Sequence, residues 1–154
     1  MIPISRLDDS LERVSKKIAK VPKDWVLFAV NEAYGIFMDR VFNEGKTTSG
    51  QSFGRYKTKA WKKKRRESGR QTVYKDLQMT GDFKNAIKKN PQKDHATIEF
   101  VGSDVLEKIA DGQEKQIGKG PIFKFSKAEK KKVIDKTVKE IREDIRKIIK
   151  ESFK

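Results

Sequence analysis

The residues with the most distinctive chemistry form a basic cluster beside aromatic side chains. Five consecutive cations, Lys62, Lys63, Lys64, Arg65 and Arg66, follow Trp61 directly, and Phe53 and Tyr56 stand a few residues upstream. Cations at this density neutralise phosphates or carboxylates, and the aromatic rings offer area for stacking. The cluster therefore predicts contact with a polyanion, either a nucleic acid or an acidic protein surface in an assembly. A solvated basic loop without a partner is the alternative.

Little else in the sequence could catalyse a reaction. The one histidine, His95, stands in a polar stretch before an expected strand, with no Ser, Cys or paired carboxylate at a catalytic spacing. The densest acids, at 8–9, 111, 114 and 143–144, lie among Lys and Arg on expected helices, which favours solvated ion pairs over a metal site. We expect no enzyme activity, no cofactor and no metal. A nuclease built on scattered acids is the least favoured class.

Known nucleotide-binding and nucleic-acid-binding motifs are not evident. The glycine-bearing segments 50–54 and 68–72 lack the Gly and Lys positions of a phosphate-binding loop. The sequence has no zinc, helix-turn-helix or aromatic RNA-binding signature. Any binding to nucleic acid would therefore depend on the basic cluster.

Composition indicates a small protein that is completed by partners. With 154 residues the chain suits a single domain, 1–154. Hydrophobic residues make up 35% and charged residues 38%, so the apolar content is low for a compact monomer and favours burial against another subunit. The net charge is +15, and residues 46–75 hold eleven Lys or Arg against one acid, Glu67. About two thirds of the excess positive charge therefore lies in one segment.

Cellular context follows from what the sequence lacks. There is no cysteine, which rules out disulfides and thiolate metal sites and suits a reducing compartment. The N-terminal residues do not form a secretion signal, and the longest apolar run, 25–30, is too short to span a bilayer. We expect a soluble intracellular protein with no membrane partner.

Apolar periodicity predicts long helices at both ends. One helix carries Leu7, Leu11, Val14, Ile18 and Val21 at intervals of three and four, and Pro22 starts a second, most buried helix that runs to about residue 43. Within it, Gly35 marks a close-packing position or a weak point. A capping box at 126–129 starts the last helix, with Ile134, Val138, Ile141, Ile145 and Ile148 on one face. The two apolar faces, represented by Leu11 and Ile141, are expected to pack together or against neighbouring subunits.

The middle of the chain predicts a long loop and a small sheet. Residues 44–74 follow neither the helical nor the strand period, except for a helical segment at 61–66. A loop of this length in a compact domain is usually functional, or disordered until it binds. Strands are expected at 73–79, 96–100 and 122–125, with a short helix closed by 90–91 and another around 106–110. The predicted fold class is α+β, with long N- and C-terminal helices packed on a small antiparallel sheet and a long basic loop.

The order of these motifs resembles the phage virion-morphogenesis family, which includes Mu-type and lambdoid neck and tail-completion proteins. The resemblance rests on the segment 50–53 followed by Trp61 and the basic run, and on 76–83 with Thr80, Gly81 and Phe83. It continues with Ala110, Glu114 and Gly118, and with 121–123 before the last helix. No single motif is specific, so the weight lies in their order and spacing.

This resemblance implies a structural virion protein of the head-tail connection, a neck or tail-completion ring subunit that joins capsid to tail. Its implied partners are further copies of itself, other phage neck, connector or tail proteins, and the packaged DNA. The implied location is the head-tail junction of the virion, after assembly in the host cytoplasm. The alternative, which rests on the residues alone, is a basic nucleic-acid-binding protein that uses the loop 46–75.

Overall fold

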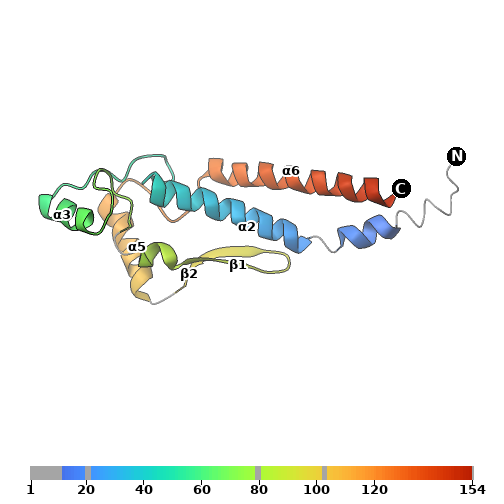
Figure 1. The fold of residues 1–154 in the computed structure, drawn as a ribbon, viewed down its shortest axis with the longest axis horizontal. Helices are drawn as coiled ribbons and strands as arrows, with labels where there is room; N and C mark the ends of the chain where they lie inside the picture. Colours follow the sequence, from blue (N-terminus) through green and yellow to red (C-terminus); the bar gives the residue numbers. More distant parts are fainter. Residues whose placement is uncertain (1–11, 20–21, 79–80, 102–103, 154) are drawn as a thin grey trace.

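Two long helices lying side by side dominate the computed structural model, which describes residues 12–19, 22–78, 81–101 and 104–153 (Figure 1). They are α2 (Pro22–Met38) and α6 (Lys127–Ser152). Helix α2 also packs against an antiparallel hairpin of β1 (Ile87–Pro91) and β2 (Ala96–Phe100). The molecule is elongated, with α3 (Lys59–Glu67) at one end. The predicted α+β class is confirmed, as is the strand at 96–100.

The C-terminal end of α2 widens into a π-helix. This segment, η1 (Asp39–Asn43), is closed by a hydrogen bond from the Glu44 amide to the Asp39 carbonyl oxygen at 2.9 Å. A π-turn holds an extra residue, and here three successive residues, Arg40, Val41 and Phe42, are buried. The predicted helix to about residue 43 is thereby confirmed. Gly35 is exposed and a Cβ there would meet nothing within 4 Å, so its predicted close packing is wrong within this chain.

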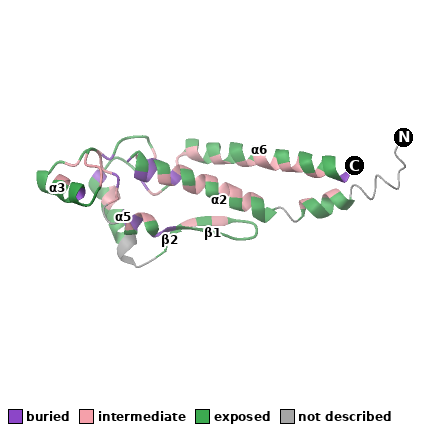
Figure 2. Cartoon of the chain, viewed as in Figure 1, coloured by how far each residue is buried: buried purple, intermediate pink, exposed green. Residues whose placement is uncertain are grey.

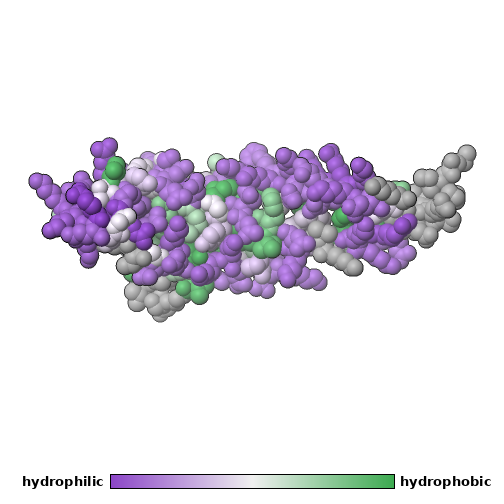
Figure 3. Space-filling model, viewed as in Figure 1, coloured by the Kyte–Doolittle hydropathy of each residue, from purple (hydrophilic) through white to green (hydrophobic). Residues whose placement is uncertain are grey.

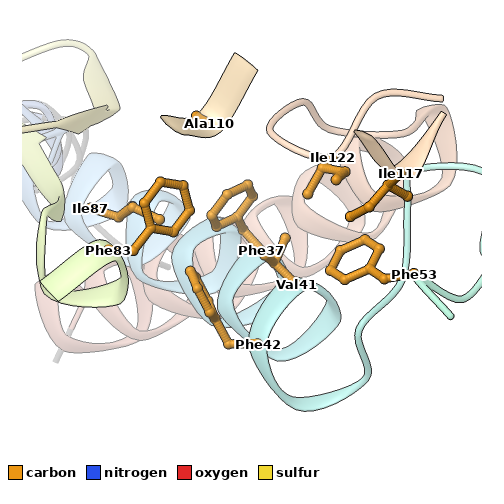
Figure 4. Close-up of a cluster of buried hydrophobic side chains, with 9 residues drawn as sticks. All are labelled: Phe37, Val41, Phe42, Phe53, Phe83, Ile87, Ala110, Ile117 and Ile122. Carbon is orange, nitrogen blue, oxygen red and sulfur yellow. The ribbon is translucent and has the colours of Figure 1, made fainter. Parts of the chain in front are cut away.

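The hydrophobic core lies where the end of α2 and η1 meet α4 (Asp82–Asn85) and α5 (Asp104–Ile117), and α6 adds no residue to it (Figures 2 and 4). Phe83 is at its centre, with ring centroids 6.3 Å from Phe42, 5.3 Å from Phe100 and 5.4 Å from Phe123. The buried members are Phe37, Val41, Phe42, Phe53, Phe83, Ile87, Ala110, Ile117 and Ile122. Edge-to-face aromatic packing thus joins segments that are distant in sequence.

Two of the predicted boundaries in the middle of the chain are wrong. The helix expected to close at 90–91 ends at Asn85, because Ile87 begins β1 and pairs with Phe100. The helical piece around 106–110 is longer than expected, since α5 has 14 residues. Helix α3 was predicted at 61–66 and is confirmed, and it interrupts the long basic loop.

The predicted strand at 122–125 is wrong, because side chains satisfy its backbone where a neighbouring strand would. One carboxylate oxygen of Glu114 accepts from the amides of Ile122 and Phe123 at 2.7 and 2.9 Å. The Arg40 guanidinium donates to the carbonyl oxygens of Ile122 and Lys124 at 3.0 and 2.7 Å. Because these two side chains pair with its backbone amides and carbonyl oxygens, the segment can be buried without hydrogen bonds to a neighbouring strand.

Arg40 joins the end of the α2–η1 helix to the start of α6. Its Nε lies 2.6 Å from Glu129 Oε1, and both side chains are nearly buried, 10% and 12% exposed. The other Glu129 oxygen accepts from the Ser126 amide at 2.7 Å, and Ser126 Oγ accepts from the Glu129 amide at 3.1 Å. The predicted capping box is therefore confirmed, and the same carboxylate also neutralises Arg40.

The apolar face predicted for α6 is divided between two environments. Ile141, Ile145 and Ile148 are half-buried, whereas Ile134 is 59% and Val138 37% exposed. Trp25 of α2 donates its indole N–H to Asp144 Oδ2 of α6 at 3.0 Å. Residues 12–18 are helical and approach the end of α6 through the Lys17–Glu151 ion pair at 3.3 Å. Leu7, Leu11 and Val21 of the predicted first helix lie outside the described residues.

Replacing Glu129 by Gln should lower the free energy of unfolding by about 3 kcal/mol at neutral pH, because it leaves the Arg40 cation buried and unpaired. Burial raises the pKa of Glu129, but hydrogen bonds from Ser126 and Arg40 outweigh burial and hold this pKa below its ordinary value of 4.5. The carboxylate therefore stabilises the fold above that pH, and its contribution is lost as the pH falls through the lower folded value. Denaturant unfolding at several pH values measures both effects.

The matched control is Glu143→Gln, which removes a surface pair with Lys139 at 3.9 Å, with side chains 48% and 79% exposed. It should change the free energy of unfolding by less than about 0.5 kcal/mol. The Glu129→Gln variant should also lose less stability than the parent protein as the pH falls from above 4.5 through the lower folded pKa of Glu129. Equal stability of the two variants at neutral pH would contradict the role given to Glu129.

Candidate functional site

Helix α3 brings the predicted basic cluster to one end of the molecule. It has nine residues, a length at which an isolated helix is marginal in water, and its i,i+4 neighbours Lys59 and Lys63, and Lys62 and Arg66, repel each other. Its last turn is basic, which suits the negative end of the helix dipole. Local interactions alone do not explain a helix with this charge, so a tertiary contact must hold it.

That contact is Arg65, which is 1% exposed. Its Nη2 donates to both carboxylate oxygens of Asp76 at 2.8 Å. The remaining donors reach the carbonyl oxygens of Gln71 and Gln78 at 2.8 and 3.0 Å. The guanidinium also lies over the ring of Tyr56, 4.5 Å from its centroid. Because charge and hydrogen bonds are both satisfied, this cation is stable in a buried site.

Further hydrogen bonds close the loop around this pair. Tyr56 donates to Asp76 Oδ1 at 3.1 Å and accepts from the Asp76 amide at 3.4 Å. Burial raises the pKa of Tyr56 above 10.0, an effect that the hydrogen bond from the Asp76 amide opposes and the negative charge of Asp76 reinforces. Tyr56 therefore keeps its proton and donates at neutral pH.

The predicted strand at 73–79 is wrong over its described residues, 73–78. The side-chain oxygen of Gln71 accepts from the amides of Val73 and Tyr74 at 2.8 and 3.2 Å. The amide of Gln78 donates to Asp76 Oδ1 at 3.0 Å. Side chains again take the place of a partner strand, and the segment runs as an ordered loop.

Glycine allows one close crossing within the loop. Gly45 has a φ of +62°, and a Cβ there would lie 2.3 Å from the carbonyl oxygen of Lys75. Close by, the Lys75 amide donates to the Gly54 carbonyl oxygen at 2.8 Å, and the Phe53 amide to that of Gly45 at 2.7 Å. The two ends of the loop are therefore bound to each other, and any larger residue at position 45 would force them apart.

Three residues predicted to contact a polyanion are instead structural. Phe53 is 3% exposed and belongs to the hydrophobic core, because the loop folds back onto η1. Arg65 is neutralised by Asp76 and has no free donor face to offer, since its donors are used inside the protein. Tyr56 is half-buried against this pair. These three hold the loop in shape and do not form the contact surface.

The remaining cluster residues face solvent. Lys63, Lys64, Arg66 and Trp61 are exposed and Lys62 is half-exposed, and the α3 end is mostly hydrophilic in the space-filling view of Figure 3. Trp61 is 38% exposed, with the Lys64 ammonium 5.7 Å from its ring centroid. Lys63 has only a loose pair with Glu67 at 3.9 Å. The structure thus presents a compact group of cations and one aromatic ring on a helix whose inner face is fixed.

The positions that carry the family resemblance are mainly architectural. Gly81 and Gly118 have φ of +98° and +62° at helix boundaries, and Phe83 and Ala110 are core residues. Glu114 was predicted to be a solvated ion-pair partner, which is wrong, because it binds the two amides of the segment after α5. Thr80 lies outside the described residues. The sequence analysis did not predict the buried ion pairs of Arg40 and Asp76. For Arg40 the possible signal was a cation on an apolar helix face, and for Asp76 it was a single acid after a basic run.

No arrangement in the described part of the chain suggests catalysis or metal binding. His95 is exposed in the turn before β2, with its Nδ1 2.8 Å from Asp94 Oδ1. The hydrogen bond with His95 is the largest of the effects that lower the pKa of Asp94. Across the described residues there is no group of three His, Cys, Asp or Glu side chains that could hold a metal ion. Nor does any helix described here combine the length and apolar character needed to cross a membrane.

Replacing Asp76 by Asn should destabilise the protein by about 3 to 5 kcal/mol, because a buried Arg65 cation would lose its counter-ion. The α3 loop should then open more often, so trypsin should cleave it faster at native conditions. Denaturant unfolding and limited proteolysis measure the two effects. Glu67→Gln, which removes an exposed pair on the same helix, is the control, and equal cleavage rates for both variants would argue against an anchoring pair.

Comparisons with protein families, with characterised proteins and with solved structures find no match to this chain. The function must therefore be inferred from the site itself. What the site offers is a fixed basic helix with an exposed tryptophan, at the end of an elongated molecule whose core is small.

Proposed function

We propose that the protein is a structural subunit of a phage head-tail connection, a homo-oligomeric neck or tail-completion ring component without enzyme activity. The observation that carries the proposal is a small hydrophobic core, with apolar side chains left exposed along α6. The proposed location, the head-tail junction of the virion, rests on the motif order that resembles the virion-morphogenesis family. Other neck, connector or tail proteins would be its neighbours.

The small core supports an assembled state. Among the described residues, the buried apolar side chains cluster around the end of α2, η1, α4 and α5. Helix α6 has 26 residues, and Ser152 is the one that it buries. An elongated subunit with so small a core gains stability by burying surface against neighbours. Ring subunits commonly meet this condition because each contributes two complementary faces.

Exposed apolar side chains along α6 support the same conclusion. Ile134 and Val138 are exposed at 59% and 37%, Ile149 at 43% and Phe153 at 41%. The first three lie on α6, which packs with α2, and Phe153 follows its last residue. None of the four belongs to the hydrophobic core. Scattered exposed apolar residues are ordinary on a monomer, but several on one straight helix form a surface that a second helix can cover.

Paired changes of Ile134→Glu and Val138→Glu should prevent self-assembly without unfolding the subunit, because both side chains are exposed in the isolated chain. Two buried carboxylates in an interface would each be strongly unfavourable. Light scattering and sedimentation would report the oligomer, and electron microscopy of virus particles would show whether a ring sits at the head-tail junction. Val73→Glu, at a residue 62% exposed in the α3 loop, is the control.

Absence of the protein from purified particles would overturn the proposed location. A strictly monomeric protein at all concentrations, together with normal incorporation of the Ile134→Glu, Val138→Glu variant into particles, would overturn the proposed interface. Circular dichroism of each variant separates failure to assemble from failure to fold.

A second candidate function is binding to nucleic acid through α3, and the exposed group of Lys62, Lys63, Lys64 and Arg66 favours it. Basic residues on a fixed helix contact phosphates without reading sequence, and Trp61 adds a surface for stacking. In a ring, the same surface would face packaged DNA along the axial passage. This candidate therefore competes with the ring proposal only if the protein acts outside a particle.

Changing these four cations to Gln should weaken binding to DNA and make the negative slope of log affinity against log salt less steep by roughly 3.6, about 0.9 for each lost phosphate contact. The matched control changes four exposed lysines of α6, Lys127, Lys130, Lys132 and Lys150, which alters the net charge equally. Electrophoretic mobility and fluorescence anisotropy at several salt concentrations measure the slope. Equal losses for both variants would indicate general charge attraction, and no binding at low salt would exclude the function.

A further inference from the structure

We infer that a pocket between α3 and α5 is a docking site for an acidic peptide segment with one large apolar side chain, contributed by a different assembly protein. The inference rests on the proposed assembly role and names the partner of its basic end. It concerns Trp61 and Ile109, which are exposed apolar residues on two different helices and line the same cavity.

The pocket has the size and lining of a binding site. Its volume is about 620 Å³, within the range of roughly 300–1,000 Å³ that is typical of ligand pockets. Trp61 lines one side and Ile109 another, with exposed fractions of 38% and 43%, while Phe83 and Leu77 from the core region also line it. Large apolar side chains that stay exposed around a concave apolar surface are a common feature of interaction sites.

The walls of the pocket are held in place, because each belongs to a fixed element. The Arg65–Asp76 pair at 2.8 Å holds α3, and Arg65 itself lines the pocket. On the other side, Glu114 ties α5 to the segment 122–123. A site preformed in this way binds an apolar anchor with little loss of conformational entropy.

The charges around the pocket select an anionic partner. Lys57 and Lys75 line it, and the exposed cations of α3 lie on the helix that forms one wall. Among the described residues that line it, Asp82 is the one with a carboxylate, and the Arg65 charge is already neutralised by Asp76. A segment with several Asp or Glu residues would be attracted to this end, and its apolar side chain would enter the cavity.

A second copy of this chain fits these charges poorly. Residues 46–75 hold eleven Lys or Arg against one acid, so the same end of another copy would be repelled from this pocket. Duplex DNA would match the cations, but the apolar group that it exposes in its major groove, the thymine methyl, is too small to fill a pocket of about 620 Å³. An acidic segment with an apolar anchor satisfies both the charge and the cavity.

The test is fluorescence anisotropy of the full chain with a labelled peptide of about twelve residues, in which glutamates flank one central phenylalanine. Trp61→Ala should weaken binding at least about tenfold, since a buried aromatic anchor contact dominates such interfaces. The double change Lys57→Glu, Lys75→Glu should weaken it by a similar factor and reduce its dependence on salt. Replacing the peptide's phenylalanine by serine should have the same effect as Trp61→Ala.

Matched variants serve as controls. Phe153→Ala removes an aromatic ring that is 41% exposed at the far end of α6, and Lys130→Glu with Lys150→Glu repeats the charge change away from the pocket. Each should change affinity less than about threefold, the part due to general attraction. Because Trp61 is exposed, its variant should keep the unfolding midpoint of the parent chain.

Other occupants give different results, and each would overturn the inference. Equal binding of the phenylalanine and serine peptides would mean simple charge attraction, and DNA binding that Trp61→Ala weakens tenfold while peptide binding is unchanged would assign the surface to nucleic acid. Loss of oligomers on Trp61→Ala would assign it to a second copy. Light scattering on the same samples keeps the proposals separate, since intact oligomers without peptide binding would overturn the docking site alone.

Discussion

Two buried arginines, each neutralised by one carboxylate, hold this structure together. Arg40 with Glu129 and Arg65 with Asp76 donate also to the carbonyl oxygens of segments that belong to no sheet. A chain with few apolar residues must still satisfy the backbone of its long loops, because an unpaired buried carbonyl or amide is costly. A planar guanidinium with five donors does this at several carbonyls at once, which a lysine could not.

The two ion pairs fix different parts of the molecule, one in its body and one at its α3 end. Arg40 joins η1 to the capping box of α6, so the long helical pair begins at a fixed point beside the aromatic core. Arg65 fixes α3, whose other cations would otherwise repel each other in a short helix. Stability is thereby concentrated near the core, while α6 extends away from it along α2 with apolar side chains uncovered (Figures 1 and 2).

This arrangement explains why one surface can serve binding while the residues beneath it serve folding. The inner side of α3 is committed to Asp76, so its outer cations and Trp61 are displayed in a defined geometry and not on a flexible loop. Burial of one cation within a run of five also lowers the repulsion at the surface. The proposed docking of an acidic segment uses this surface of α3. The proposed ring uses it as well, together with the exposed apolar residues of α6.

The sequence by itself determined the two long helices α2 and α6, the hairpin strand at 96–100 and the capping box, because periodicity and capping are local and depend on neighbouring residues. It also located the basic cluster. Only the tertiary structure decided that Phe53 and Arg65 turn inward, that Glu114 binds amides, and that the segments 73–78 and 122–125 are not strands. Their apolar residues resemble those of strands, but side chains distant in the sequence supply the hydrogen bonds, and no local pattern encodes that choice.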